Sequence, residues 1–70
     1  MRDKRFARAL YDYSPQEEGE LRLQVYDVIE VLNRDESGWW YGRCQGSLGV
    51  FPSNYVEVIS VEDVGKETVS

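Results

Sequence analysis

Residues 38–43 read GWWYGR, and this short stretch decides how the chain is expected to fold. Successive side chains of a β-strand point to opposite faces, so Trp39 and Trp40 cannot both enter one small core. Trp39 shares its face with Tyr41 and Arg43. Because an unpaired arginine is costly to bury, this face is predicted to be the outer one. Trp39 is therefore expected to point away from the core.

An outward Trp39 has two interpretations that these six residues leave open. The ring covers a neighbouring loop as a satellite of the core, or it belongs to a binding surface. Other aromatic residues favour the second, because Tyr11, Tyr13 and Tyr55 flank predicted loops and carry hydroxyls suited to a wet boundary. Such a surface, with acidic residues nearby, suits a proline-rich, positively charged peptide, because the free carbonyls of a polyproline II helix can accept hydrogen bonds from it.

Short strands separated by turn signals continue on both sides of this stretch. The expected strands cover residues 6–11, 28–32, 39–44, 47–51 and 55–59, and a further alternating pair is Leu21 and Leu23. Turns are expected at residues 14–19, 33–38 and 45–46. Apolar residues nowhere keep a helical period for three turns. Five short strands therefore predict a small all-β barrel or sandwich.

Size and charge limit the classes of function. Seventy residues make one domain with a thin core. The net charge of −5 argues against nucleic acid as the partner, since a nucleic-acid reader carries a basic stripe. Seven acids and only two arginines lie between residues 14 and 38. They are either a solvated surface, which composition alone favours, or a negative field beside a groove for a basic ligand.

Missing residue types exclude several kinds of chemistry. The chain has no histidine, and no nucleophile with a base, metal cluster or phosphate loop is visible, so no enzyme activity, cofactor or metal is predicted. Cys44 is the only cysteine, which rules out an intrachain disulfide, and it is expected to be structural. A reducing, cytoplasmic location is expected, cytoskeletal or membrane-peripheral through a parent protein. No membrane span or secretory signal is visible.

Several motifs together resemble the SH3 domain family over residues 6–60. They are ALYDY at 9–13, Glu20-Leu21, the tryptophan pair at 39–40, GVFP at 49–52 and SNYV at 53–56. Each is weak alone, but their order and spacing are highly specific. The resemblance implies a small five-stranded barrel of two packed antiparallel sheets, with RT, n-Src and distal loops and a short 3-10 turn. Residues 1–5 are expected to be a disordered flank and residues 61–70 a flexible tail or linker.

The resemblance implies a protein–protein interaction module that binds PxxP peptides with a flanking Arg or Lys. The module is expected to be a monomeric part of a larger multidomain adaptor or signalling protein, without nucleic acid or membrane insertion. The implied proline pockets are lined by Tyr11, Tyr13, Trp39, Pro52 and Tyr55, and Asn54 and the Trp39 indole are the implied donors to ligand carbonyls. Val50 stands at a groove position that is often aromatic, so one pocket is expected to be shallower.

A third implied pocket, between the RT and n-Src loops, would hold the basic residue of the ligand. Glu20 matches the family's principal acidic position there. The other implied acids are Glu17, Glu18, Asp35 and Glu36. Solvation alone also explains Glu18 and Asp35. The direction in which the peptide lies in the groove stays open.

Alternation and the resemblance together predict the core. Its expected members are Ala7, Ala9, Leu21, Leu23, Ile29, Val31, Gly42, Phe51 and Val56, with Gly42 small because Phe51 needs the room. Family members often have glycine before the acid of the diverging turn, where this chain has Tyr26 before Asp27. A turn that needs positive φ would strain Tyr26, so a different kind of turn is expected.

Two other binding functions are weighed against the peptide-binding module. The first is an atypical SH3 domain that binds a folded partner, such as ubiquitin or another domain, over the same face. In the family, ubiquitin binding tends to accompany Phe in place of the final groove tyrosine, and Tyr55 argues against it. The second is a small β-barrel reader of nucleic acid, which the acidic net charge opposes.

Overall fold

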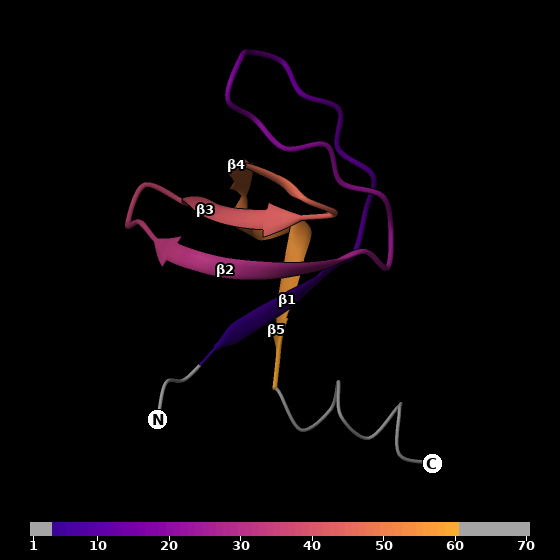
Figure 1. Cartoon of the computed structure of the whole chain (residues 1–70), viewed down its shortest axis with the longest axis vertical. Helices are drawn as coiled ribbons and strands as arrows, with labels where there is room; N and C mark the ends of the chain where they lie inside the picture. The colour runs from indigo at the N-terminus through magenta and orange to yellow at the C-terminus, as the bar shows by residue number, and fades with distance from the viewer. Residues whose placement is uncertain (1–3, 61–70) are drawn as a thin grey trace.

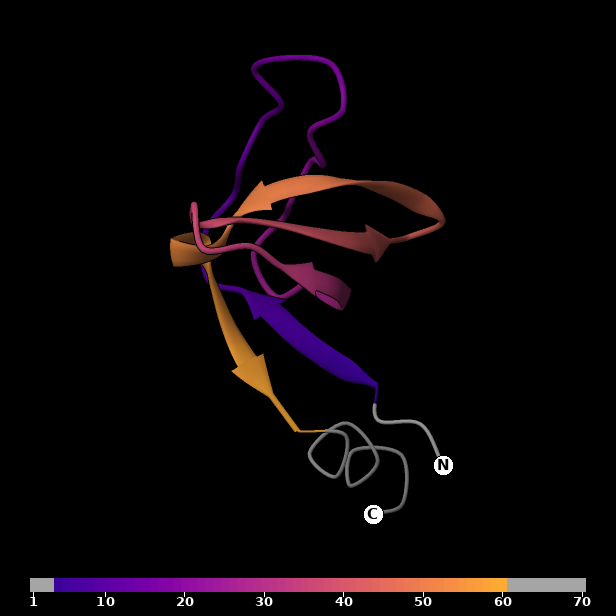
Figure 2. The ribbon, with the colours of Figure 1, turned by 90° about the vertical axis from the view of Figure 1, so that its left-hand side faces the viewer.

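The computed structural model describes residues 4–60 and joins five strands into one antiparallel sheet (Figure 1). The elements are β1 (Arg5–Ala9), β2 (Val28–Arg34), β3 (Trp39–Cys44), β4 (Ser47–Pro52), the 3-10 turn η1 (Ser53–Tyr55) and β5 (Val56–Ile59). Their order in the sheet is β4-β3-β2-β1-β5. Figure 2 shows β1 and β5 slanting away from the other three strands. The two packed layers expected from the sequence are thus two parts of one bent sheet.

The strand boundaries agree with the predicted ones to within two residues at each end. β3 matches residues 39–44, and β2 continues through Arg34, whose guanidinium lies 5.2 Å from the centre of the Trp40 ring. β4 includes Pro52, which an edge strand tolerates because its missing N–H removes no ladder bond. β1 already begins at Arg5, inside the flank expected to be disordered. Residues 1–3 and the expected tail at 61–70 lie outside the described residues.

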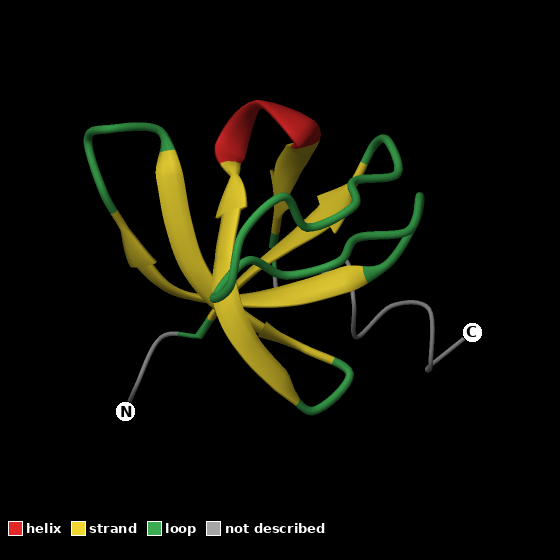
Figure 3. Cartoon of the chain, turned by 90° about the horizontal axis from the view of Figure 1, so that it is seen from above, coloured by secondary structure: helices red, strands yellow, loops and turns green. Residues whose placement is uncertain are grey.

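The long connection between β1 and β2, residues 10–27, forms the expected RT loop without becoming a regular hairpin. Its two arms meet in a single bridge between Tyr13 and Leu23. The expected 3-10 turn is η1, the red segment in Figure 3. Within residues 4–60, no helix is long and apolar enough to cross a membrane.

The hydrophobic core lies between the two parts of the bent sheet, and the prediction of its members is confirmed. All nine expected residues are buried: Ala7, Ala9, Leu21, Leu23, Ile29, Val31, Gly42, Phe51 and Val56. Cys44 and Ile59 are buried as well. Trp40 is half-buried and meets the Phe51 ring edge-on, with 6.3 Å between ring centres. Alternation therefore placed the two tryptophans on the correct faces.

Gly42 allows β3 to lie against β2 and the Phe51 ring. A Cβ atom at Gly42 would stand 2.6 Å from the Glu30 carbonyl oxygen, 2.9 Å from Ile29 Cγ2 and 3.0 Å from Phe51 Cε2. The prediction that Gly42 is small because Phe51 needs the room therefore explains part of the requirement for glycine. The backbone of β2 is the closer obstacle, and a carbonyl in a ladder cannot move aside as a flexible side chain can.

The diverging turn corrects one expectation, because Tyr26 has a φ of +77°. The different kind of turn expected from the sequence is wrong. Two backbone bonds require the observed geometry: the Tyr26 N–H donates to the Ala9 carbonyl at 2.8 Å, and the Asp27 N–H donates to the Gln24 carbonyl at 2.9 Å. The Tyr26 side chain is 76% exposed. The turn thus retains its left-handed residue without a glycine.

Tyr26→Gly is expected to stabilise the domain. An L-residue in the left-handed region destabilises the folded state by roughly 1–2 kcal/mol. Glycine removes this cost, but it also raises the entropy of the unfolded chain, which cancels part of the gain. The expected gain in the free energy of unfolding is about 0.5–1 kcal/mol, measured by urea denaturation. Tyr26→Ala is the matched control, since it removes the ring but keeps the strain. Equal stabilisation by both variants would show that the ring, and not the backbone, is the cause.

Candidate functional site

Four aromatic rings form a continuous row along one face of the domain. Neighbouring ring centres are 5.8 Å apart from Tyr11 to Tyr55, 5.4 Å from Tyr55 to Tyr13 and 6.2 Å from Tyr13 to Trp39. All three pairs meet edge-on, the geometry that aromatic quadrupoles favour. Tyr13 and Tyr55 pack against the core, whereas Tyr11 and Trp39 are exposed. The aromatic row thus presents exposed and partly buried rings, three of which carry hydroxyls.

Backbone hydrogen bonds bring three distant segments together under the aromatic row. The Leu10 N–H donates to the Tyr55 carbonyl at 2.8 Å, which ties the start of the RT loop to η1. The Ser53 N–H donates to the Gly38 carbonyl at 2.8 Å, which ties η1 to the n-Src turn at residues 35–38. The row is therefore positioned by main-chain contacts that side-chain substitutions leave in place.

Trp39 points outward, as its alternation with Trp40 predicts. It is the first residue of β3, pairs with Pro52 of β4 and is 39% exposed. The n-Src turn fixes its backbone, since the Trp39 N–H donates to the Ser37 hydroxyl at 3.3 Å. The ring contacts the RT loop through Tyr13 and leaves much of its surface to solvent. Covering a loop and offering a binding surface are therefore compatible roles for one ring.

Glu20 is linked directly to the aromatic row. The Tyr13 hydroxyl and the Gln16 backbone N–H both donate to Glu20 Oε1, each at 2.7 Å. These bonds, first that of Gln16 and then that of Tyr13, hold the pKa of Glu20 below its usual value. The hydrogen bond between the Tyr13 hydroxyl and Glu20 is also the main cause that raises the pKa of Tyr13 to about 12. The Glu20 carboxylate is thus held next to Tyr13, the ring that neighbours Trp39 in the aromatic row.

The remaining predicted acids lie on the two loops next to Trp39. Glu17 and Glu18 are exposed on the RT loop, and Asp35 and Glu36 are exposed on the n-Src turn. The hydroxyl and N–H of Ser37 lower the pKa of Asp35, and the N–H bond measures 3.1 Å. All four carboxylates therefore face solvent next to Trp39.

The other predicted site residues differ in how much they offer to a ligand. Asn54 is exposed on η1, whereas Pro52 is buried across from Trp39. Val50 is half-buried, and its backbone holds the RT loop: its N–H donates to the Gly19 carbonyl and its carbonyl accepts from the Leu21 N–H, both at 2.8 Å. Val50 therefore fixes the loop as well as lining the face.

Sequence reasoning missed the residues that position the site. Gln16 acts through its backbone N–H and Ser37 through its N–H and hydroxyl. Every residue except proline has a backbone N–H, so the residue type does not show which N–H will donate to Glu20. Ser37 had a weak signal, because serine is common in turns that hydrogen-bond their own backbone.

The model of the variant SH3 domain matches residues 9–57 of the chain. This chain belongs to the SH3 domain family. It is 54% identical to mouse CD2-associated protein over 61 residues, which is 86% of this chain and 10% of that protein. It is 43% identical to human SH3 domain-containing kinase-binding protein 1, covering 87% of this chain and 9% of that protein. The chain thus spans about a tenth of the length of these relatives.

Solved structures agree with the SH3 assignment. The C-terminal SH3 domain of myosin IB from Entamoeba histolytica, bound to EhFP10(GEF) peptide, superposes with a TM-score of 0.79 at 41% identity, covering 84% of this chain and 98% of that one. The yeast Pin3 SH3 domain gives a TM-score of 0.72 at 38% identity, covering 74% of this chain and 93% of that one. SH3 domains are non-catalytic protein-interaction modules, so this chain is assigned to that class.

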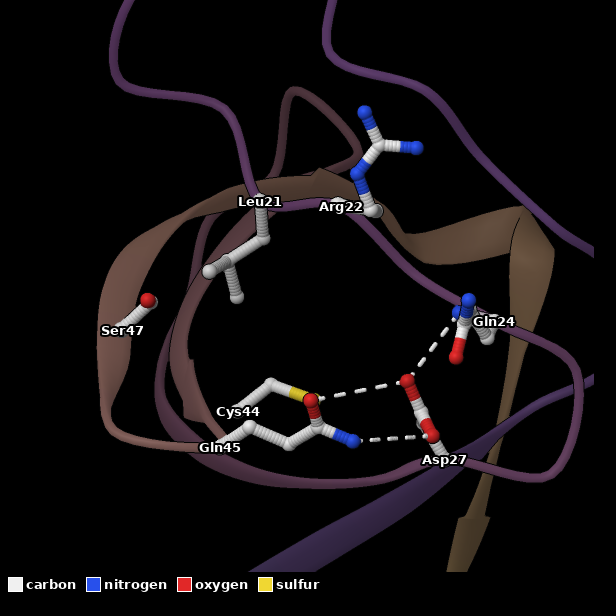
Figure 4. Close-up of a pocket in the computed structure, with 7 residues that line it drawn as sticks. All are labelled: Leu21, Arg22, Gln24, Asp27, Cys44, Gln45 and Ser47. Atoms are coloured by element: carbon white, nitrogen blue, oxygen red, sulfur yellow. Dashed lines mark hydrogen bonds between the residues drawn. The ribbon is translucent and has the colours of Figure 1, made fainter.

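A separate pocket of about 320 Å³ in this SH3 domain shares no residue with the aromatic row (Figure 4). The Asp27 carboxylate lies in this pocket and accepts hydrogen bonds from the Cys44 thiol at 3.9 Å and from the Gln45 side-chain amide at 3.4 Å. Burial, followed by the charge of Asp27, raises the pKa of the Cys44 thiol. A raised pKa lowers the fraction of reactive thiolate. The structural role predicted for Cys44 therefore fits its surroundings.

Tyr13→Phe is expected to raise the pKa of Glu20, because it removes one of the hydrogen bonds that favour the carboxylate. The measurement is a pH titration of the Glu20 side-chain carboxyl by NMR. The wild-type pKa of Glu20 is lowered by folding, so its contribution to stability is present at neutral pH. That contribution is lost as the pH falls through the folded-state value.

Tyr11→Phe is the matched control for this titration. It removes another hydroxyl of the aromatic row, one with no hydrogen bond to Glu20. The Glu20 pKa should be the same in Tyr11→Phe as in the wild type. An unchanged Glu20 pKa in Tyr13→Phe would contradict the proposed cause.

Proposed function

We propose that this SH3 domain binds proline-rich PxxP segments with a flanking Arg or Lys along the aromatic row. The observation that supports this most is the row itself, four rings that end at Trp39 with an ionised Glu20 beside them. Proline rings pack on flat aromatic faces. The Tyr11 and Tyr55 hydroxyls, the Trp39 indole and Asn54 can donate to the carbonyls of a polyproline II helix, which makes no internal hydrogen bonds.

The acids beside Trp39 supply the site for the basic residue of the ligand. Glu20 is held in place by Tyr13 and Gln16, so little side-chain entropy is lost when a cation approaches it. The exposed acids on the RT loop and the n-Src turn add attraction from both sides, and the net charge of −5 favours encounter with a basic partner. A small interface of this kind gives affinities on the order of micromolar, or about −8 kcal/mol.

The same proposal includes the kind of protein that carries the domain and the direction of the bound peptide. The domain acts as an adaptor module of a larger cytoplasmic protein, as its small share of the related proteins suggests. A polyproline II helix is pseudo-symmetric, so the groove accepts it in either chain direction. The acids select the direction, because they fix where the basic residue lies.

The test is an NMR titration with three peptides: RxxPxxP, PxxPxR and a neutral proline-rich control. Shifts centred on Trp39, Tyr55 and the RT loop, larger for one basic peptide, are expected and would give the ligand direction. Glu20→Lys should weaken that basic peptide much more than the neutral one. Equal losses would remove Glu20 from the basic pocket. No shifts with any peptide would contradict the proposal and favour a folded partner on this face.

A further inference from the structure

Ser14 is the only serine or threonine of the chain that proline follows, and it is exposed on the RT loop. Proline restricts the residue before it to extended backbone and has no N–H of its own that needs a partner. Protein kinases accept extended segments with an exposed hydroxyl, and one class of serine/threonine kinases requires proline directly after the serine. Ser14 and Pro15 therefore meet the requirements of a proline-directed kinase.

Arg22 lies across the RT loop from Ser14. Tyr13 and Leu23 form an antiparallel bridge, in which they exchange two backbone hydrogen bonds of 2.8 and 2.9 Å. The next residues toward the tip of the loop, Ser14 and Arg22, are therefore opposite each other, with side chains on one face. Leu23 is buried, so the face shared by Ser14 and Arg22 is the outer one, and both residues are exposed.

The Arg22 guanidinium is available to a new anionic partner. Within residues 4–60, Arg22 forms no ion pair. Figure 4 shows its side chain leading away from Asp27, the acid of the pocket that Arg22 helps to line. A guanidinium presents its N–H donors in a planar fork that fits two oxygens of a phosphate. The residue opposite Ser14 is thus the type that binds phosphate best.

We propose that Ser14 is a phosphorylation site and that Arg22 binds the phosphate, which joins the two arms of the RT loop. In the transfer step, the Ser14 Oγ attacks the γ-phosphorus of ATP held by a proline-directed serine/threonine kinase. The Oγ–P bond forms, the bond from this phosphorus to the β,γ-bridging oxygen breaks, ADP leaves, and the hydroxyl proton passes to the catalytic base of the kinase. The phosphate carries a charge of about −1.5 to −2 at neutral pH and pairs with Arg22 through charge-assisted hydrogen bonds.

The phosphate bridge between Ser14 and Arg22 would also regulate the basic pocket, and this part of the inference rests on the proposed function. Glu20 stands two residues before Arg22, and it accepts the hydroxyl of Tyr13, the residue before Ser14. Unpaired, the Arg22 cation repels a basic residue that approaches Glu20. The phosphate neutralises this cation and leaves additional negative charge on the loop. Basic peptides should therefore bind more tightly, whereas neutral ones should not.

The first test asks whether the folded domain is a kinase substrate. The whole chain is incubated with ATP and each of several proline-directed serine/threonine kinases, and tandem mass spectrometry locates the phosphate. At least one kinase is expected to phosphorylate Ser14, and Ser14→Ala should abolish this product. The absence of phosphate at Ser14 with every kinase would overturn the assignment of the modification site.

The second test measures the phosphate bridge on whole chains made by chemical synthesis, with Ser14 either unmodified or phosphorylated. Phosphorylation should raise the thermal midpoint by about 4 °C and slow amide exchange at residues 13–23 about fivefold. Arg22→Gln should abolish both effects. Arg43→Gln is the matched control, since it removes an exposed arginine of β3 and should keep both. No effect in the wild-type sequence, or effects that survive Arg22→Gln, would overturn the bridge.

The third test is calorimetric titration of both synthetic chains with RxxPxxP, PxxPxR and the neutral peptide. At low salt, phosphorylation should tighten binding of the preferred basic peptide about threefold and leave that of the neutral peptide unchanged. Equal affinities of the two chains for the basic peptide, with the bridge present, would overturn the regulation alone. If neither chain binds any peptide, the proposed function fails, while the thermal midpoint and the exchange rates still decide whether the bridge forms.

Discussion

Trp39→Ala is expected to weaken binding of a short PxxP peptide by at least thirtyfold while the domain stays folded. Trp39 lies where the aromatic row meets the two acidic loops, so in the proposed complex its ring contacts both the proline and the basic part of the ligand. Central aromatic anchors of this kind cost about 2 kcal/mol or more when truncated. Because the ring lies outside the core cluster, thermal stability should fall only slightly. Calorimetric titration and a thermal melt provide the two measurements.

Tyr41→Ala is the matched control for Trp39→Ala. Both side chains lie on the outer face of β3, and both are 39% exposed. A short PxxP peptide should bind Tyr41→Ala as it binds the wild type. Unfolding of Trp39→Ala would show that the ring chiefly covers the RT loop. Unchanged affinity would remove Trp39 from the binding face.

Most of the fold could be predicted from the sequence, because the alternation of inward and outward side chains along each strand determines which residues are buried. Trp39 and Trp40 fix which face of β3 is inside, and the turn residues Gln45 and Gly46 fix its hairpin with β4, both at positive φ. Nine buried positions follow from the same period of two combined with the family resemblance. The diverging turn was predicted wrongly because Tyr26 occupies a backbone conformation that its residue type disfavours. Backbone hydrogen bonds, absent from any local pattern, impose that conformation.

The candidate site could be predicted less completely than the fold. The family motifs supplied its aromatic members, and the structure places four of them in one row. The bonds of Glu20 to Tyr13 and to the Gln16 N–H could not be predicted, because they depend on the path of the RT loop.

The structure separates two tasks within one strand. The outer face of β3 carries Trp39, the proposed ligand contact, and the inner face carries Gly42 against β2. A change at Trp39 should therefore alter affinity at constant stability. Changes on the inner face should alter stability, and affinity only through the fraction of folded molecules. Gly42→Ala tests the second half of this statement.

Gly42→Ala is expected to lower the free energy of unfolding by about 3 kcal/mol. Its Cβ would stand 2.6 Å from the Glu30 carbonyl oxygen, and β3 and β2 would have to separate to accept it. A core in a chain this short rarely supplies more than about 3–5 kcal/mol, so much of the stability would be lost. The thermal midpoint should fall by more than about 12 °C. Circular dichroism melts and urea denaturation measure both quantities.

Arg43→Ala is the control for Gly42→Ala, because it changes the next residue on the exposed face of the same strand. It removes only the exposed ion pair with Glu30, which contributes less than about 1 kcal/mol. The apparent peptide Kd of Gly42→Ala should rise by the inverse of its folded fraction and no further. A Kd that rises while the domain remains fully folded would mean that the two faces of β3 are coupled. A midpoint within a few degrees of the wild type would mean that β3 and β2 can separate at little cost.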